Sequence, residues 1–172
     1  MTARGPRVVL VGPPGAGKTT VGELLASRLG VALRDTDADL VEAEGRSIQD
    51  IFVTDGEPAF RVLEERAVAV ALEEHDGVLS LGGGAVLSAR TREALAGHPV
   101  VFLDVGLSGA TSRVGLSSAR PLLLGNVRSR LKQLLDERRP VYTEVATATV
   151  VTDDLSPGEV ADAVLGAIEE DR

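Results

Sequence analysis

The sequence predicts a single α/β domain in which a five-stranded parallel sheet is covered by helices on both faces. Short apolar runs that suit buried strands alternate with amphipathic helical patterns along the chain of 172 residues. No internal repeat and no long linker interrupts that alternation. Because a chain of this length can bury one core without disulfides or structural metal, we expect residues 1–172 to form one domain.

The first half of the chain shows the alternation clearly. A strand is expected at residues 7–12, and a helix follows from Gly17 to a C-cap at Gly30. A short apolar run at residues 31–33 leads into a polar helical stretch that ends at Gly45. Two more helices have start and stop signals, a short one from Ser47 to Gly56 and a long one from Glu57 to Glu74.

The second half repeats the pattern. Its strands share short aliphatic runs, and we expect them at residues 78–81, 100–105 and 147–151. Its helices share apolar positions three or four residues apart, and we expect them at residues 88–96, 108–114 and 126–140 and from Ser156 onward. Pro140 should limit the third of these helices, because proline has no N–H to donate.

One stretch between the first strand and the first helix carries a chemical signature. The sequence Gly12-Pro13-Pro14-Gly15-Ala16-Gly17-Lys18-Thr19 fits G-x-x-x-x-G-K-[ST], in which glycines let backbone N–H groups form an anion nest at a helix N-terminus. Lys18 would place a cation on the β- and γ-phosphates, and the Thr19 hydroxyl would ligate Mg²⁺. A plain Gly/Pro turn is the alternative, but the flanking strand and helix favour a phosphate-binding loop. The predicted nucleotide contacts are Gly15, Ala16, Gly17, Lys18, Thr19 and Thr20.

Composition and charge argue against several classes of partner. The formal net charge of -8 disfavours binding to a nucleic-acid backbone, which needs a basic face, and four aromatic residues are too few for base stacking. No apolar run approaches the roughly 18 residues of a membrane helix. The chain has no cysteine, which suits a reducing compartment. We expect a soluble cytoplasmic protein that binds neither nucleic acid nor a membrane.

Two further groups of residues follow strands, at the edge where parallel sheets bind ligands. Asp35 and Asp37 come after the second strand, and Gly82-Gly83-Gly84 after the third. Alone, the aspartates could form a solvated turn and the glycines a flexible one, but their position favours a ligand site. The segment 115–125 is bracketed by glycines and carries Arg120, as a lid over phosphates would, although a surface loop would look similar.

Together these residues favour a small-metabolite kinase. Phosphoryl transfer to an alcohol needs cations, a carboxylate near Mg²⁺ and a carboxylate at the hydroxyl. Asp35 and Asp37 could divide the two carboxylate roles, and Arg120 could supply a cation. The N-K-x-D sequence of guanine-reading GTPases is absent.

Beyond these patterns, the chain resembles the shikimate kinase family nearly from end to end. The matching motifs are the phosphate-binding loop, Asp35-Thr36-Asp37, Phe60-Arg61 with Glu64-Glu65, Ser80-Leu81-Gly82-Gly83-Gly84, Arg120-Pro121-Leu122-Leu123 and Arg138-Arg139-Pro140-Val141-Tyr142. The resemblance implies a P-loop fold of the nucleoside monophosphate kinase-like group, with residues 36–62 as the substrate-binding segment and 115–125 as the lid. It also implies that ATP and Mg²⁺ are used to phosphorylate the 3-hydroxyl of shikimate, and we expect a monomer.

The resemblance also implies roles for single residues. Asp37 would contact the reacting hydroxyl, while Arg61 and Arg138 would clamp the substrate carboxylate, which guanidinium forks bind bidentately. If the register is off by one, Arg139 takes the role of Arg138. The backbone of Gly82, Gly83 and Gly84 would hydrogen-bond the ring hydroxyls. On the donor side, the implied contacts are Lys18 and Arg120 at the transferring phosphate, Arg113 and Ser156 at the adenine, and Thr19 with Asp35 at Mg²⁺.

Two alternatives stay open. One is a related kinase for gluconate or a nucleoside monophosphate, although two arginines placed for a carboxylate make a nucleotide acceptor less natural. The other is a non-catalytic ATP-binding module, against which the presence of Asp37, Arg61 and Arg120 argues.

Overall fold

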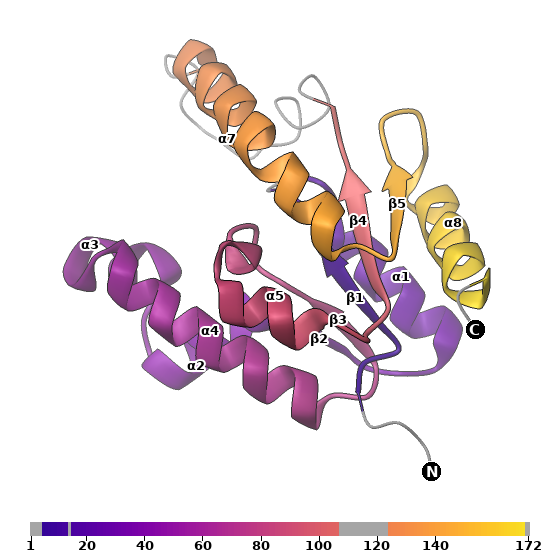
Figure 1. Cartoon of the computed structure of the whole chain (residues 1–172), viewed down its shortest axis with the longest axis horizontal. Coiled ribbons are helices and arrows are strands. Elements are labelled where there is room, and N and C mark those ends of the chain that lie inside the picture. Colours follow the sequence, from indigo (N-terminus) through magenta and orange to yellow (C-terminus); the bar gives the residue numbers. More distant parts are fainter. Residues whose placement is uncertain (1–4, 14, 107–123, 171–172) are drawn as a thin grey trace.

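The computed structural model describes residues 5–13, 15–106 and 124–170, and it contains one sheet between two layers of helices (Figure 1). The strands are β1 (Val8–Val11), β2 (Leu33–Asp35), β3 (Val78–Ser80), β4 (Val100–Asp104) and β5 (Ala148–Val151). They pair in the order β2-β3-β1-β4-β5, and every pairing is parallel. The predicted five-stranded parallel α/β sheet is therefore confirmed.

Seven α-helices and one 3₁₀ turn lie within the described residues. They are α1 (Lys18–Leu29), α2 (Thr36–Glu44), α3 (Ile48–Asp55), α4 (Glu57–Glu74), η1 (Ala85–Leu87), α5 (Ala89–Leu95), α7 (Leu124–Val145) and α8 (Pro157–Glu170). The predicted caps are present, because Ser47 and Ser88 accept hydrogen bonds from backbone N–H groups at the starts of α3 and α5. The helix expected at residues 108–114 and most of the segment 115–125 lie outside the described residues.

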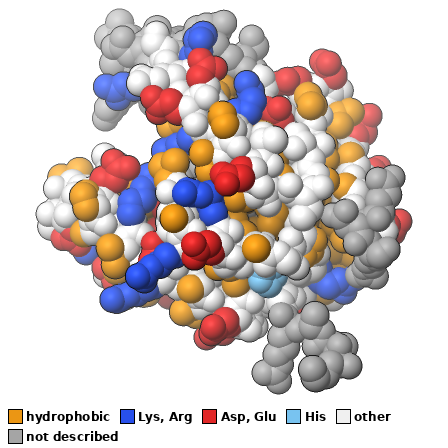
Figure 2. Space-filling model, in the orientation of Figure 1, with side chains coloured by type: hydrophobic (Ala, Val, Ile, Leu, Met, Phe, Trp, Pro, Cys, Tyr) orange, Lys and Arg blue, Asp and Glu red, His pale blue; other side chains and the backbone are white. Residues whose placement is uncertain are grey.

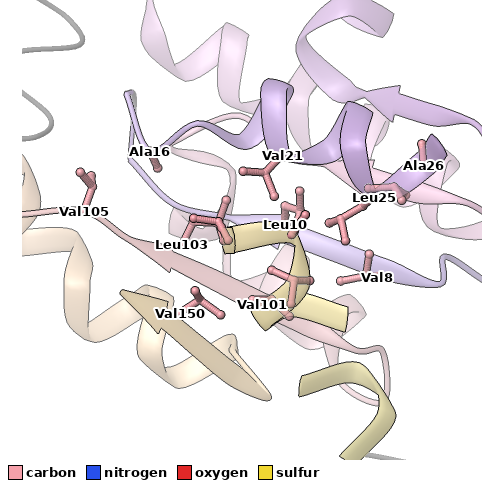
Figure 3. Close-up of a cluster of buried hydrophobic side chains, with 14 of the residues drawn as sticks. Val8, Leu10, Ala16, Val21, Leu25, Ala26, Val101, Leu103, Val105 and Val150 are labelled. Carbon is pink, nitrogen blue, oxygen red and sulfur yellow. The ribbon is translucent and has the colours of Figure 1, made fainter. Parts of the chain in front are cut away.

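Each face of the sheet is covered by its own hydrophobic cluster. Val8 and Leu10 of β1 point to the side of α1 and α8, in the cluster drawn in Figure 3. Val9 and Val11 point to the opposite side, where α4, α5 and α7 pack. Successive side chains of a strand face opposite ways, so burial on both faces requires the continuous apolar run seen in β1.

A third, smaller cluster joins α2, α3 and α4 beside the sheet. Its buried members are Leu40, Ile51 and Phe60. The rings of Phe52 and Phe60 lie 4.5 Å apart between their centroids. This cluster gives residues 36–62, the predicted substrate-binding segment, a core of their own.

The prediction that Pro140 limits its helix is wrong, because α7 continues past the proline to Val145. Proline removes one intrahelical hydrogen bond, but the turn after it is anchored by packing. Tyr142 is buried, and Val141 and Val145 pack against the same cluster. Burial of an apolar face outweighs the lost hydrogen bond here.

The surface carries mixed charges. On the face shown in Figure 2, acidic and basic side chains lie interspersed. Among the described residues, no helix is both long enough and apolar enough to cross a membrane.

Candidate active site

Three groups of predicted site residues lie at the carboxyl ends of strands: the phosphate-binding loop after β1, Asp35 and Asp37 at the end of β2, and Gly82-Gly83-Gly84 after β3. The connection after β1 runs toward the β2 edge of the sheet, whereas the connection after β4 runs toward the β5 edge. Open parallel sheets bind ligands at such a reversal, where the loops after the strands diverge. The fold therefore places a crevice beside the loop that follows β1.

The phosphate-binding loop has the backbone shape that its glycines predict. Gly12, Gly15 and Gly17 have φ angles of 154°, 83° and 88°, which favour glycine. A Cβ on Gly12 would lie 2.8 Å from the carbonyl oxygen of Leu103, so β4 leaves no space for a side chain there. The loop ends directly in α1, whose first N–H groups and dipole favour an anion.

Lys18 lies inside this loop. Its ammonium donates hydrogen bonds to the carbonyl oxygens of Gly12 (2.7 Å) and Pro13 (3.1 Å). Burial lowers the pKa of Lys18 from 10.5 to about 8, and the nearby carboxylates of Asp37 and Asp35 oppose that shift. The cation is thus held in the loop close to both aspartates.

Asp35 and Asp37 stand at the junction of β2 and α2. The Asp35 carboxylate caps the helix by accepting the Asp37 N–H at 2.8 Å. Asp37 lies in the first turn of α2, and its pKa is raised mainly by burial and then by the charge of Asp35. The charges of Lys18 and Arg61 oppose this rise, so both cations act on the Asp37 carboxylate.

The loop after β3 packs against two charged side chains. A Cβ on Gly82 would lie 2.6 Å from Oδ1 of Asp37, and a Cβ on Gly84 would clash with the guanidinium of Arg61. Glycine is needed at both positions because the space that a side chain would fill is taken by these two groups.

The backbone groups of Gly82-Gly83-Gly84 can be accounted for one by one. The Gly82 N–H donates to the hydroxyl of Thr36 at 3.3 Å, and the Gly83 carbonyl accepts from the Tyr142 hydroxyl. The carbonyls of Gly82 and Gly84 accept N–H groups of the following turn at 3.1 Å each. Among the described residues no acceptor faces the N–H groups of Gly83 and Gly84, so these two donors are left for a ligand.

Arg61 is fixed by its own helix. Its guanidinium donates to Glu64 at 2.8 Å and to Glu57 at 3.3 Å, and it lies 5.3 Å from the ring centroid of Phe60. Glu64 is 3% exposed, and burial raises its pKa while Arg61 lowers it. Residues three apart on a helix are neighbours, so local spacing alone accounts for this pair.

Arg138 and Arg139 point to different groups. Arg139 bonds the carboxylate of Asp104 at 3.1 Å, at the end of β4. The charge of Arg138 instead acts on Lys18, Glu64 and Tyr142, all of which border the site. This geometry favours the register in which Arg138 is the substrate contact, a role that stays a prediction.

A hollow of about 150 Å³ lies beside the start of α1. Its lining includes Ala16, Gly17, Thr20, Thr152 and Pro157. Sequence reasoning missed Thr152, whose buried Oγ1 has no hydrogen-bond partner among the described residues. Its place directly after β5, at the ligand-binding edge, was the available signal.

Three predicted nucleotide contacts are not brought into this geometry. Arg113 and Arg120 lie outside the described residues. The Ser156 hydroxyl accepts the Glu159 N–H at 3.2 Å and the Glu159 carboxylate accepts the Ser156 N–H at 3.0 Å, which makes a capping box for α8. Ser156 therefore has a structural role whether or not it also contacts a nucleotide.

The residues predicted for Mg²⁺ offer oxygen ligands, which this cation prefers, and they are few in number. One oxygen of Asp35 is used by the α2 cap, and its other oxygen has no hydrogen-bond partner in the part of the chain that the structure describes. The hydroxyl of Thr19 lies in the exposed first turn of α1. Mg²⁺ commonly takes one or two protein oxygens and completes its shell with phosphate and water, so this pair suffices.

The sheet order, the phosphate-binding loop, and the cluster of Asp37 and Arg61 against the loop after β3 define a P-loop phosphotransferase of the nucleoside monophosphate kinase-like group. A family model described as "Shikimate kinase" matches residues 14–169. The chain belongs to the shikimate kinase family.

Relatives and solved structures agree with this membership. The shikimate kinase of Saccharopolyspora erythraea is 61% identical over 97% of this chain and 96% of its own, and that of Streptomyces avermitilis is 61% identical over 95% and 96%. The solved shikimate kinase of Acinetobacter baumannii in complex with shikimate has a TM-score of 0.89 and 35% identity, covering 98% of this chain and 94% of its own. A gluconokinase of Sinorhizobium meliloti shares only the fold, at 20% identity and a TM-score of 0.57.

Proposed function

We propose that this protein is a shikimate kinase that transfers the γ-phosphoryl group of ATP to the 3-hydroxyl of shikimate, giving shikimate 3-phosphate and ADP. The observation that carries the proposal is the meeting of Lys18 with Asp37 and Arg61 at one edge of the sheet. A loop for phosphates and a pocket for a small acid thus share a border. Family membership and the shikimate-bound relative support the choice of acceptor.

The acceptor half would recognise a hydroxy acid. Arg61 and Arg138 are the two guanidinium groups placed for the carboxylate. The N–H groups of Gly83 and Gly84, which meet no acceptor among the described residues, would donate to ring hydroxyls. Asp37 would accept the hydrogen bond of the reacting hydroxyl. A neutral sugar would leave both arginines without an anion to bind, so we expect it to bind more weakly than a hydroxy acid.

The donor half would hold the phosphates of ATP with Gly15, Ala16, Gly17, Lys18, Thr19 and Thr20. Mg²⁺, held by Thr19 and Asp35 together with the phosphates, would neutralise charge on the transferring group. Arg113, Arg120 and Ser156 remain predicted contacts of the nucleotide. Lys18 would exchange its two loop carbonyls for phosphate oxygens.

In the proposed transfer, one bond to the γ-phosphorus forms as another breaks, and one proton leaves the acceptor hydroxyl. The acceptor oxygen forms a bond to the γ-phosphorus as the bond from that phosphorus to the β,γ-bridging oxygen breaks. The hydroxyl proton is released toward Asp37. Because burial and Asp35 raise the pKa of Asp37, its carboxylate binds a proton more readily than an exposed aspartate does.

An ADP-release assay with a panel of acceptors tests the proposal. Purified protein with ATP and Mg²⁺ should release ADP with shikimate, and not with gluconate or a nucleoside monophosphate. Removal of Mg²⁺ with a chelator should stop the release. Turnover with gluconate alone, or ATP binding without turnover on any acceptor, would favour one of the two alternatives instead.

The variant Asp37→Asn should lower kcat by roughly 10²-fold or more while ATP affinity changes little, because the amide cannot take the proton. Asp39→Asn is the matched control, since Asp39 lies on the same helix and pairs with Arg34 instead. Equal kcat values for Asp37→Asn and the parent would remove Asp37 from the reaction.

Three finer expectations accompany the function. We expect the enzyme to be a cytoplasmic monomer that does not bind nucleic acid. Light scattering coupled to size exclusion should give the mass of one chain, 17.9 kDa.

A further inference from the structure

Tyr142 connects α7 with β4 and with the loop after β3. It is 1% exposed and lies one turn after Arg138 on α7. Its ring packs on Phe102 of β4 with 5.0 Å between the centroids. Its hydroxyl donates a hydrogen bond to the carbonyl oxygen of Gly83, in the loop after β3. A purely apolar core position would be filled equally well by phenylalanine, so the hydroxyl calls for an explanation.

Tyr142 bonds the Gly83–Gly84 peptide, whose N–H group meets no acceptor among the described residues. The carbonyl of Gly83 and the N–H of Gly84 belong to the same peptide unit. The described residues contain no cis peptide bond, so these two groups point in opposite directions. Fixing the Gly83 oxygen on one side therefore fixes the Gly84 N–H on the other, where no acceptor among the described residues meets it.

A turn encloses this peptide, because the Ala85 N–H donates to the Gly82 carbonyl at 3.1 Å, but that bond does not involve the peptide's own C=O and N–H groups. The peptide lies between two glycines, whose backbones rotate more freely than those of any other residue. The Gly82 N–H is tied to Thr36 at 3.3 Å, which fixes the Leu81–Gly82 peptide but not this one. Among the described residues, the Tyr142 hydroxyl is the group that hydrogen-bonds to the Gly83–Gly84 peptide.

We propose that Tyr142 is a positioning residue for the acceptor, whose hydroxyl fixes the Gly83–Gly84 peptide so that the Gly84 N–H is a preoriented donor to a non-reacting hydroxyl of the substrate. The inference rests on the proposed function, since it assigns a partner to that donor. Because Arg138 is on the same helix, α7 also sets the spacing between the carboxylate contact and the hydroxyl contact. A preoriented donor binds more tightly because less freedom is lost when the ligand arrives.

The test is Tyr142→Phe, which keeps the ring and removes the hydroxyl. The KM for shikimate should rise roughly fivefold to tenfold, the amount that one hydrogen bond contributes, while the KM for ATP stays unchanged. Thr143→Val is the matched control, because it removes a hydroxyl from the adjacent residue that bonds only the Arg139 carbonyl, at 2.8 Å. Phe102→Leu controls for packing, since it removes the contact between the two rings and keeps the hydroxyl group of Tyr142.

A second measurement does not depend on turnover. In the parent, the amide resonance of Gly84 should shift when shikimate is added, and in Tyr142→Phe that shift should shrink, whereas in Thr143→Val it should persist. An unchanged KM for shikimate in Tyr142→Phe, or a rise matched by Phe102→Leu at equal loss of thermal stability, overturns the inference. Failure of the parent to phosphorylate shikimate would instead overturn the proposed function, so the two failures are distinct.

Discussion

Lys18 is a half-buried cation whose ammonium is held by its own loop. Its ammonium bonds the carbonyls of Gly12 and Pro13, and burial lowers its pKa to about 8. An arriving phosphate favours the charged form of the lysine, so nucleotide binding should raise that pKa. Binding of ATP and uptake of a proton are therefore linked near pH 8.

We expect ATP affinity to fall as the pH rises from 8 toward 10, because the free protein then holds Lys18 without its proton. Titration calorimetry in buffers of different ionisation enthalpy should show proton uptake on binding in the same range. Burial of charged Lys18 also opposes folding. The unfolded chain binds more protons than the folded protein between the two pKa values, about 8 and 10.5, so this penalty shrinks and stability rises as the pH increases across that window.

Lys18→Arg serves as the control for this pH dependence, because a guanidinium does not lose its proton in this range. Its ATP affinity, although weaker, should not vary with pH through the same mechanism. If the parent and Lys18→Arg showed the same pH profile, the dependence would belong to another group.

At the scale of single elements, α7 places two adjacent arginines in different environments. Arg138 acts on the charges of the pocket, whereas Arg139 bonds Asp104 at the end of β4. Adjacent residues on a helix point about 100° apart, so only one of the pair can face the acceptor.

Arg138→Lys should raise the KM for shikimate about tenfold or more, because an ammonium cannot reproduce the bidentate fork. Arg139→Lys should change that KM little, since it only weakens a partly exposed pair with Asp104. Steady-state kinetics with shikimate varied at saturating ATP measures both variants. A larger effect in Arg139→Lys would shift the register of the substrate contact by one residue.

Sequence patterns predicted the elements well where the signal is local. The phosphate-binding loop, the caps at Ser47, Ser88 and Ser156, and the pairing of Arg61 with Glu64 all involve residues close together in the chain. The contacts of Tyr142 with Gly83, 59 residues apart, and of Gly82 with Thr36, 46 apart, could not be derived from spacing. Pro140 shows the same limit, because the local rule ends the helix whereas packing of the following turn continues it.

At the scale of the whole molecule, the acceptor segment has a core separate from the two that cover the sheet. Leu40, Ile51 and Phe60 form it, and α3 packs only against α2 and α4 among the closely contacting elements of the described chain. Damage to this small cluster should therefore open the segment locally while the sheet stays folded.

Ile51→Ala should loosen α3, because removing a fully buried isoleucine side chain costs about 2–5 kcal/mol. We expect a higher KM for shikimate, an unchanged KM for ATP and faster hydrogen exchange over residues 47–56. Leu25→Ala is the matched change in the cluster between the sheet and α1. It should lower the melting temperature of the whole protein without separating the two KM values.

The glycine loop after β3 has a consequence for inhibitors of this enzyme. Side chains at Gly82 and Gly84 would occupy the space that Asp37 and Arg61 fill, and the two free donors beside them belong to the backbone. A compound that bonded these N–H groups would contact atoms that every amino acid except proline shares. Resistance by substitution at the contact itself would then remove the substrate pocket together with the drug, so escape would have to arise elsewhere in the chain.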